Sequence, residues 1–273
     1  MSVFRSSEIN DDVGLLELPM EAEWVVNDGQ HRVAGIAEAM KHDPTLRYDH
    51  LSVVILPDGG LERNQQVFSD LNRAVQKTSK SLDILFDHRL PINRITNACV
   101  DRLSLFKGKT DKERVSLSLR AAQFATLSWF QAANVQLFGG IEIPEDIGDD
   151  DYRKLEDRAV EFWEFATGVV TPWSSIADGT MKPADARVDY LSSYALVLWA
   201  VASAGHSAMK APGDWRTRLD PLQNVDWLKT NQEWQGICMQ GGEVITRSTT
   251  RKATADLLRW KIGLGEKPQP KDL

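Results

Sequence analysis

Apolar residues recur at helical intervals over most of the chain after residue 60, and this periodicity limits the fold more than any other feature. The pattern predicts helices over residues 67–85, 113–138, 152–167, 185–204 and 251–262. Gly139 and Gly140 are typical of a helix end. The stretch 211–242 carries no such period and is predicted to be irregular. The greater part of the chain is therefore expected to form a helical lobe.

The first 60 residues carry a different pattern. Residues 23–27 and 51–56 are rich in aromatic and β-branched side chains and predict two strands, and a shorter strand is expected within 13–19. Between them, apolar residues at spacings of three and four predict a helix over 31–40. We therefore expect an α+β fold (mixed α/β), with a small sheet domain over residues 1–110 and a helical C-terminal lobe over residues 111–273.

Composition and sequence pattern indicate where in the cell the protein is expected. No apolar run approaches the roughly 20 residues that a membrane span needs, and the N-terminus shows no signal-peptide pattern. Cys99 and Cys238 lie far apart without metal-ligand spacing, which favours buried, reduced thiols and a cytoplasmic location. The nine tryptophans are interpreted as core or as packing beneath a loop, in preference to stacking on bases.

The formal net charge of −7 argues against a protein that coats nucleic acid through bulk charge, so any DNA contact must use a local basic patch. Two segments qualify. Arg73, Lys77 and Lys80 follow one another at helical spacings of four and three, and Arg247, Arg251 and Lys252 fall within a run that also holds Ser and Thr. The alternative for both segments is a solvated charged face. No helix-turn-helix or other familiar DNA-reading motif is present in the sequence.

The run Asp28-Gly29-Gln30-His31-Arg32 stands where the predicted strand gives way to the predicted helix. Free N–H groups and the dipole favour an anion at a helix N-terminus, and glycine allows close approach. Arg32 offers a planar fork for phosphate oxygens and His31 a second donor. Asp28 could cap the helix or hold a metal ion. The alternative is an Asp-capped helix with two solvent-facing basic residues.

This run resembles the signature of the DGQHR-domain proteins of bacterial DNA phosphorothioation systems, of which the DndB proteins are the most similar. The resemblance extends over residues 15–265. It includes the blocks 61–73, 78–82, 87–89 and 239–244. Relatives carry several dozen more residues before the motif strand, so we expect this chain to be short at its N-terminus.

The resemblance implies a motif domain similar to ParB and sulfiredoxin. Sulfiredoxins carry a reactive cysteine where this chain has Gln30, which excludes thiolate chemistry and leaves phosphate binding. On this basis the predicted catalytic residues are Asp28, His31 and Arg32. The predicted phosphate or nucleotide ligands are Gly29, Gln30, His31, Arg32, Asn64 and Asn72. The predicted metal ligands are Asp28, Glu62 and Asp70.

Three functions are consistent with these residues. The first is a DNA-binding regulator of the phosphorothioate modification system, and the second a hydrolase of ATP with Mg²⁺, coupled to DNA binding or nicking. The third is a scaffold that engages the modification complex through its helical lobe. The expected partners are double-stranded DNA and proteins of the modification machinery, with no membrane. A homo-oligomer is compatible with the sequence.

Overall fold

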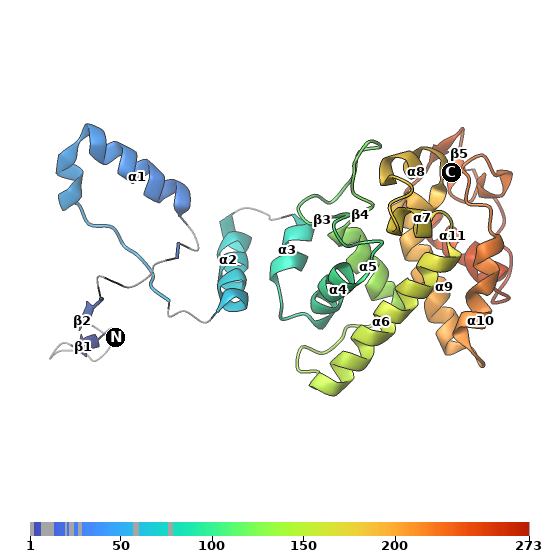
Figure 1. Cartoon of the computed structure of the whole chain (residues 1–273), viewed down its shortest axis with the longest axis horizontal. Helices are drawn as coiled ribbons and strands as arrows, with labels where there is room; N and C mark the ends of the chain where they lie inside the picture. The colour runs from blue at the N-terminus through green and yellow to red at the C-terminus, as the bar shows by residue number, and fades with distance from the viewer. Residues whose placement is uncertain are drawn as a thin grey trace. The chain divides into compact units, whose positions relative to one another are not determined.

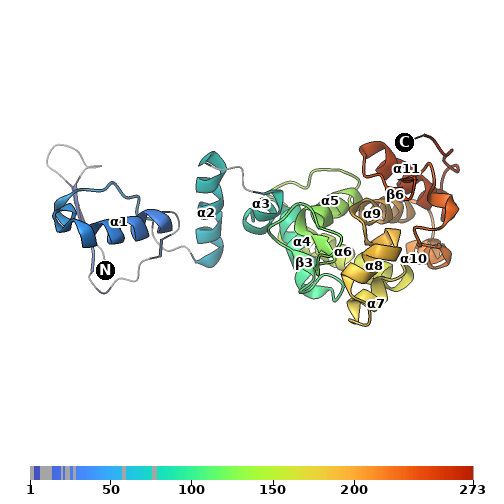
Figure 2. The same ribbon diagram turned by 90° about the horizontal axis from the view of Figure 1, so that it is seen from above.

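The computed structural model describes residues 3–6, 14–19, 21, 25–26, 29–56, 60–75 and 79–272, with 3–6 and 70–75 described by their backbone alone. The chain forms two compact units, residues 1–71 and 72–273 (Figures 1 and 2). Together they make a mixed α+β protein with a mostly helical body, as predicted.

The first unit combines one hairpin with helices. Its elements are β1 (Val3–Ser6), β2 (Gly14–Glu17), α1 (Gln30–His42), the 3₁₀ helix η1 (Pro44–Tyr48) and α2 (Leu61–Val75) up to Leu71, since the last four residues of α2 fall in the second unit. The strands β1 and β2 pair antiparallel, with Val3 opposite Glu17. β2 and α1 confirm the strand predicted within 13–19 and the helix predicted over 31–40. The side chain of Asp43 starts η1 by accepting a hydrogen bond from the backbone N–H of Thr45.

The two longer strands predicted in this unit are wrong where the structure describes them. Val25 and Val26 lie outside any strand, and so do all of residues 51–56. Residues 23, 24 and 27, which complete the strand predicted over 23–27, lie outside the described part of the chain. β-propensity records how well a side chain fits a pleated, half-buried surface, and it does not supply the neighbouring strand. The predicted strand-helix-strand layer is therefore replaced by the β1–β2 hairpin.

The second unit is a helical body. Its helices are α3 (Lys80–Phe86), α4 (Pro91–Arg102), α5 (Leu127–Leu137), α6 (Asp149–Val169), α7 (Trp173–Ala177), α8 (Pro183–Asp189), η2 (Leu191–Ser193), α9 (Ala195–Lys210), α10 (Trp215–Leu219), η3 (Asp220–Asn224), η4 (Gln232–Trp234) and α11 (Ser248–Lys261). Its short strand pairs are β3 (Thr110–Asp111) with β4 (Ala125–Thr126) and β5 (Met239–Gln240) with β6 (Glu243–Val244). The helices predicted over 152–167 and 251–262 are confirmed by α6 and α11.

Helix α9 lies at the centre of this body because it is apolar on nearly all sides. Ten of its 16 residues are buried, and it packs against α5, α10 and α11 (Figure 2). At Gly205 of α9 a Cβ would stand 2.2 Å from the ring of Phe162, so glycine leaves room for this ring of α6. The core around these helices is rich in aromatic rings, with Trp163 wholly buried.

Three buried polar side chains of the core form a hydrogen-bonded chain. The indole Nε1 of Trp163 donates to Oδ1 of Asn134 at 2.7 Å, and Nδ2 of Asn134 donates to Thr96 at 3.1 Å. Trp227 and Trp234, predicted to pack beneath a loop, are buried and stacked with ring centres 5.6 Å apart. Both cysteines are buried and free, as predicted. Burial raises the pKa of Cys99 to about 12 and that of Cys238 to about 11.

The helix predicted over 113–138 is wrong in its first half, since α5 begins only at Leu127. The stretch 112–124 is irregular because side chains distant in sequence bond its carbonyl oxygens: Ser79, Ser81 and Trp129 bond those of residues 113–115, and Arg187 bonds those between Ser118 and Phe124. Arg187, on α8 and only 2% exposed, donates through Nη1 to Ala121 at 3.1 Å and through Nη2 to Gln123 at 2.6 Å. Longer bonds reach the carbonyls of Ser118, Leu119 and Phe124. We call the segment 112–124 the pinned loop.

Two other predicted helices are divided. The helix predicted over 185–204 breaks between α8 and α9, where the backbone N–H of Leu191 donates to the carbonyl of Trp227 at 2.8 Å. The helix predicted over 67–85 comprises α2 and α3, and Ser79 caps the second of these. The proposed division of the chain at residue 110 remains a prediction, although α3 and α4 pack with α5 inside the second unit.

Candidate functional site

The motif predicted to bind phosphate forms the start of α1. Gly29 is the residue before the first helical turn, and its φ of 97° lies in the left-handed region that favours glycine. The N–H of Val33 donates to the carbonyl of Gly29 at 2.9 Å, which closes the first turn. Gln30 donates from its side chain to the carbonyl of Val26 at 2.8 Å and so ties the helix start to the preceding segment. The expected turn and helix are therefore present.

Charge at this helix start favours an anion. The first turn of α1 has no acidic residue, and its N–H groups have no acceptor within the helix. His31 and Arg32 are both exposed. The guanidinium of Arg32 lies against Gly29, where a Cβ would meet its Nε at 3.4 Å. The structure thus brings Gly29, His31 and Arg32 together, and their role toward a phosphate remains a prediction. Asp28 lies outside the described residues.

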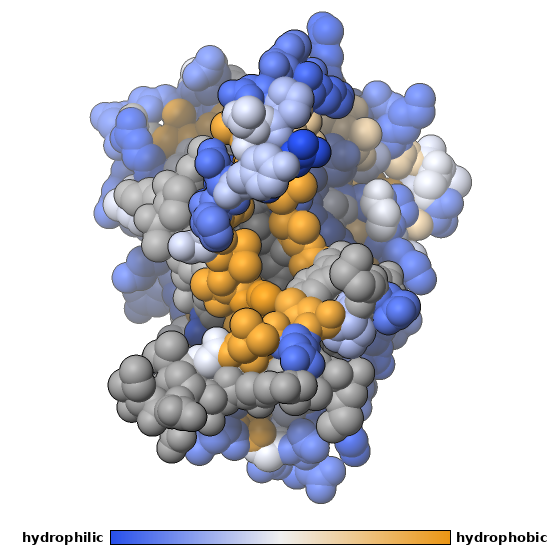
Figure 3. Space-filling model, turned by 90° about the vertical axis from the view of Figure 1, so that its left-hand side faces the viewer, coloured by the Kyte–Doolittle hydropathy of each residue, from blue (hydrophilic) through white to orange (hydrophobic). Residues whose placement is uncertain are grey.

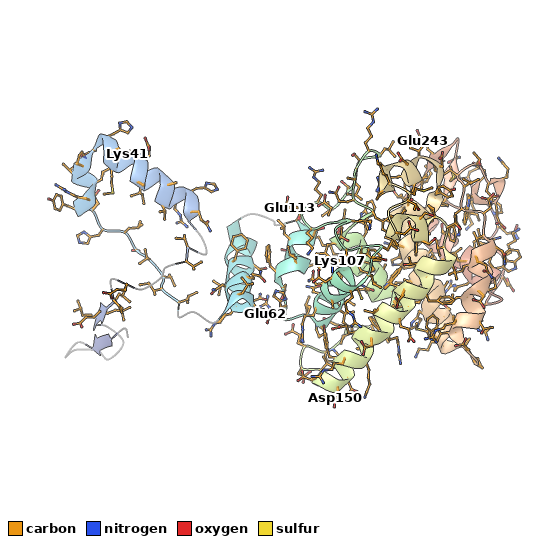
Figure 4. All side chains as sticks on the ribbon, viewed as in Figure 1. Lys41, Glu62, Lys107, Glu113, Asp150 and Glu243 are labelled. Atoms are coloured by element: carbon orange, nitrogen blue, oxygen red, sulfur yellow. The ribbon has the colours of Figure 1, made fainter. Side chains whose placement is uncertain are left out.

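The remaining predicted ligands are on α2. Glu62 is exposed in the first turn of this helix (Figure 4), and Asn64 is half-buried. Asp70 and Asn72 belong to the same helix, but the structure describes only their backbone. Within the described part of the chain, no group of three His, Cys, Asp or Glu side chains could hold a metal ion. Because Asp28 and the Asp70 side chain fall outside that part, the metal site remains a prediction.

The first basic segment loses its single-helix geometry. Helix α2 ends at Val75 and α3 begins at Lys80, so the three cations do not share one continuous helix. Lys80 is exposed at the start of α3, whereas Lys77 and the side chain of Arg73 lie outside the described residues. Their contact with DNA remains a prediction that helical spacing no longer supports.

The second basic segment forms the start of α11, which we call the α11 start (residues 247–252). Thr250 is buried and fixes the turn, because its Oγ1 donates to the carbonyl of Ile245 at 2.6 Å and accepts from the N–H of Arg247 at 2.9 Å. The first turn contains no acidic residue. Arg247 and Lys252 are exposed, and the guanidinium of Arg251 lies 4.7 Å from the ring centre of Trp199.

The three cations of the α11 start lie close together in sequence and have no carboxylate partner among the described residues. In the part of the chain that the structure describes, Arg247, Arg251 and Lys252 are not ion-paired with any carboxylate. Among the described residues of the second unit some other cations also lack an ion pair, such as Lys107, Arg114 and Lys182, whereas others are neutralised by carboxylates. Examples are Arg102 with Glu156 at 2.8 Å, Lys154 with Asp151 at 2.7 Å and Lys261 with Glu233 at 2.6 Å. Three uncompensated cations beside a helix N-terminus produce a local positive field in an acidic protein.

Two features of this unit were not predicted from the sequence. One is the packing of Arg251 on Trp199, which is half-buried and not fully in the core. The other is a groove of about 810 Å³ between α9, α11 and the C-terminal tail, lined by residues that include His206, Lys210 and Arg259. The groove holds carboxylates as well, and Arg259 is paired with Asp256. No local sequence signal joins these segments, since their contact depends on the tertiary fold.

Fold and sites together define a mostly helical α+β protein with a glycine turn at one helix start and an uncompensated basic start on another. No described helix is both long and apolar enough to cross a membrane. A family model described as DndB, DNA-sulfur modification-associated, matches residues 1–265, and the chain belongs to this family. It therefore takes part in DNA sulfur modification. Comparison with curated proteins and with solved structures returned no match.

Proposed function

We propose that this protein is a DNA-binding regulator of the DNA sulfur-modification system and that it contacts the duplex backbone through the α11 start. The observation that carries the proposal is the set of three cations without carboxylate partners at a helix N-terminus, in a member of a DNA-modification family. Proteins of the modification machinery are proposed as further partners.

The chemistry of the α11 start suits phosphate. Lysine and arginine neutralise phosphates and release counterions, while backbone N–H groups and hydroxyl side chains position the duplex. Ser248 and Thr249 supply exposed hydroxyls beside these cations. Stacking on Trp199 restricts the guanidinium of Arg251 and reduces the entropy lost when it binds. These groups recognise the backbone and carry no sequence information directly, so base reading is assigned to no residue.

A second candidate function is nucleotide hydrolysis with ATP and Mg²⁺. It is favoured by the glycine turn before α1, where His31 and Arg32 stand exposed on a first turn free of acidic residues. Such a turn can receive a phosphate, and catalysis would further need carboxylates to hold Mg²⁺. Purified protein that releases no phosphate from any nucleoside triphosphate, with DNA present or absent, would remove this candidate.

The DNA contact is tested by a mobility-shift assay with the full chain and duplex DNA from upstream of the modification genes. Binding at low salt that weakens steeply with added salt is expected. The variant R247A/K252A removes two exposed, uncompensated cations and should weaken binding. The matched control R153A/K154A removes the same net charge from cations that face Asp150 and Asp151, and it should bind like the wild type. Absence of binding by the wild type at low salt would contradict the proposal.

A further inference from the structure

The first unit has no hydrophobic core of its own among its described residues. Every buried hydrophobic side chain in the described part of the chain lies at Ile84 or beyond, in the second unit. Apolar side chains of the first unit are exposed instead, and Figure 3 shows apolar side chains gathered on the surface that faces the viewer. Monomeric proteins rarely expose contiguous apolar patches of more than a few hundred Å², and larger patches mark binding surfaces.

Residues 51–56, which we call the unpaired run, are the longest continuous run of exposed, mainly apolar residues described in the first unit. Their sequence is Leu-Ser-Val-Val-Ile-Leu, and their backbone lies outside any helix or strand. None of their backbone groups hydrogen-bonds with another residue that the structure describes. All five apolar side chains are exposed, Val54 by 89%. The run thus offers both apolar side chains and free backbone donors and acceptors.

A run with these properties is a template for strand pairing. A β-prone segment with unpaired N–H and C=O groups can bind another strand through backbone hydrogen bonds, and apolar side chains add burial. This also explains why the sequence indicates a strand here while the isolated chain forms none. The missing element is the neighbouring strand.

We propose that the neighbour is the same run in a second copy of this chain, paired antiparallel across a two-fold axis. Antiparallel pairing of identical segments is self-complementary, and two-fold dimers are the commonest oligomers. The run contains no charged residue, so pairing it with itself brings no like charges together. This inference goes beyond the DNA contact proposed above and does not rest on it.

The exposed apolar area of the first unit is comparable in size with one side of a standard interface. Helix α1 exposes Val33, Ile36 and Met40, and Tyr48 follows in η1. With the unpaired run, these side chains expose on the order of 1,000 Å², compared with roughly 800 Å² per partner in a standard interface.

The mass of the full chain in solution tests the proposal. Sedimentation equilibrium should give twice 30.6 kDa at micromolar concentrations. Val54→Lys removes little packing from a monomer, because Val54 is almost fully exposed, and lysine blocks edge pairing. We expect this variant to raise the dimer dissociation constant at least tenfold. The control Ile141→Lys places the same charge at an exposed apolar residue of the second unit and should remain dimeric.

A distance measurement tests the geometry. Both native cysteines are buried, so a spin label on Ser52→Cys is selective. Because a strand rises about 3.3 Å per residue, paired runs place the two residue-52 backbones within about 20 Å of each other. A wild type that stays monomeric up to about 100 µM, well above a micromolar dissociation constant, would overturn the proposal in favour of a different protein as the occupant. A dimer unaffected by Val54→Lys, or one with distant labels, would also overturn it.

Discussion

The buried guanidinium of Arg187 is predicted to hold the pinned loop in place, and replacing it should cost more stability than any exposed substitution. Arg187→Met keeps an unbranched apolar stem but removes all donors to the loop carbonyls. Two of the bonds, to Ala121 and Gln123, have short distances of 3.1 and 2.6 Å, while the other three are 3.3 to 3.4 Å. The two short bonds therefore dominate the estimate.

The magnitude follows from the two short bonds. A hydrogen bond to a charged group contributes about 1.5–3 kcal/mol, and a buried acceptor left unsatisfied costs about 1–3 kcal/mol. Burying the guanidinium costs free energy, and the same desolvation lowers the pKa of Arg187. The methionine variant avoids this cost, which offsets part of the loss. A net loss of about 4 kcal/mol is expected. For a unit of roughly 150–250 residues, that loss lowers Tm by about 8–16 °C.

Thermal unfolding followed by circular dichroism measures this loss, and hydrogen exchange over residues 112–124 localises it. Arg187→Lys keeps the charge without the planar fork and should recover less than half of the lost stability. The control Arg158→Met changes an exposed arginine on α6 and should stay within about 0.5 kcal/mol of the wild type. If Arg187→Met unfolded within about 2 °C of the wild type, and not about 8–16 °C below it, the reasoning would be refuted.

Two further predictions concern the helix start at Gly29 and the thiols. His31→Ala and Arg32→Ala should each weaken ATP binding by about 1.5–3 kcal/mol in titration calorimetry. The fold should be unchanged, because both side chains are exposed. Equal affinities in variant and wild type would show that the motif has only a structural role. Cys99 and Cys238 should resist thiol reagents at pH 8, because burial raises the pKa of each above the ordinary value of 9.0. The same shifts stabilise the folded state below pH 9, and this stability should fall as the pH rises from 9 toward 12, as a urea-denaturation series would show. Fast modification of the native protein, or stability that is flat across that range, would contradict the prediction.

Sequence patterns predicted elements whose causes are local. The helical period of apolar residues was sufficient to predict α1, α6 and α11. Their sequence context was likewise sufficient to predict that Trp163 and both cysteines are buried. The predictions are wrong in segments whose conformation depends on a residue far away in sequence. Arg187 determines the pinned loop from more than 60 residues away in sequence, and the N–H of Leu191 breaks a helix by bonding to Trp227.

The same distinction between local and tertiary causes applies to the candidate sites. The glycine turn before α1 could be predicted because φ preference and helix polarity are local properties. The basic character of the α11 start was visible in the sequence, but its lack of carboxylate partners was not, since ion pairs join residues far apart in the chain. Packing of Arg251 on Trp199 likewise depends on α9 and α11 lying side by side.

The most direct test of the DNA-contact proposal is the slope of log K against log salt concentration for binding to duplex DNA. Each phosphate contact contributes about −0.9 to that slope, so R247A/K252A should reduce its magnitude by about two relative to the wild type. The control R153A/K154A should keep the wild-type slope, since its cations face carboxylates. Equal slopes for the wild type and R247A/K252A would contradict the assignment of the α11 start to DNA.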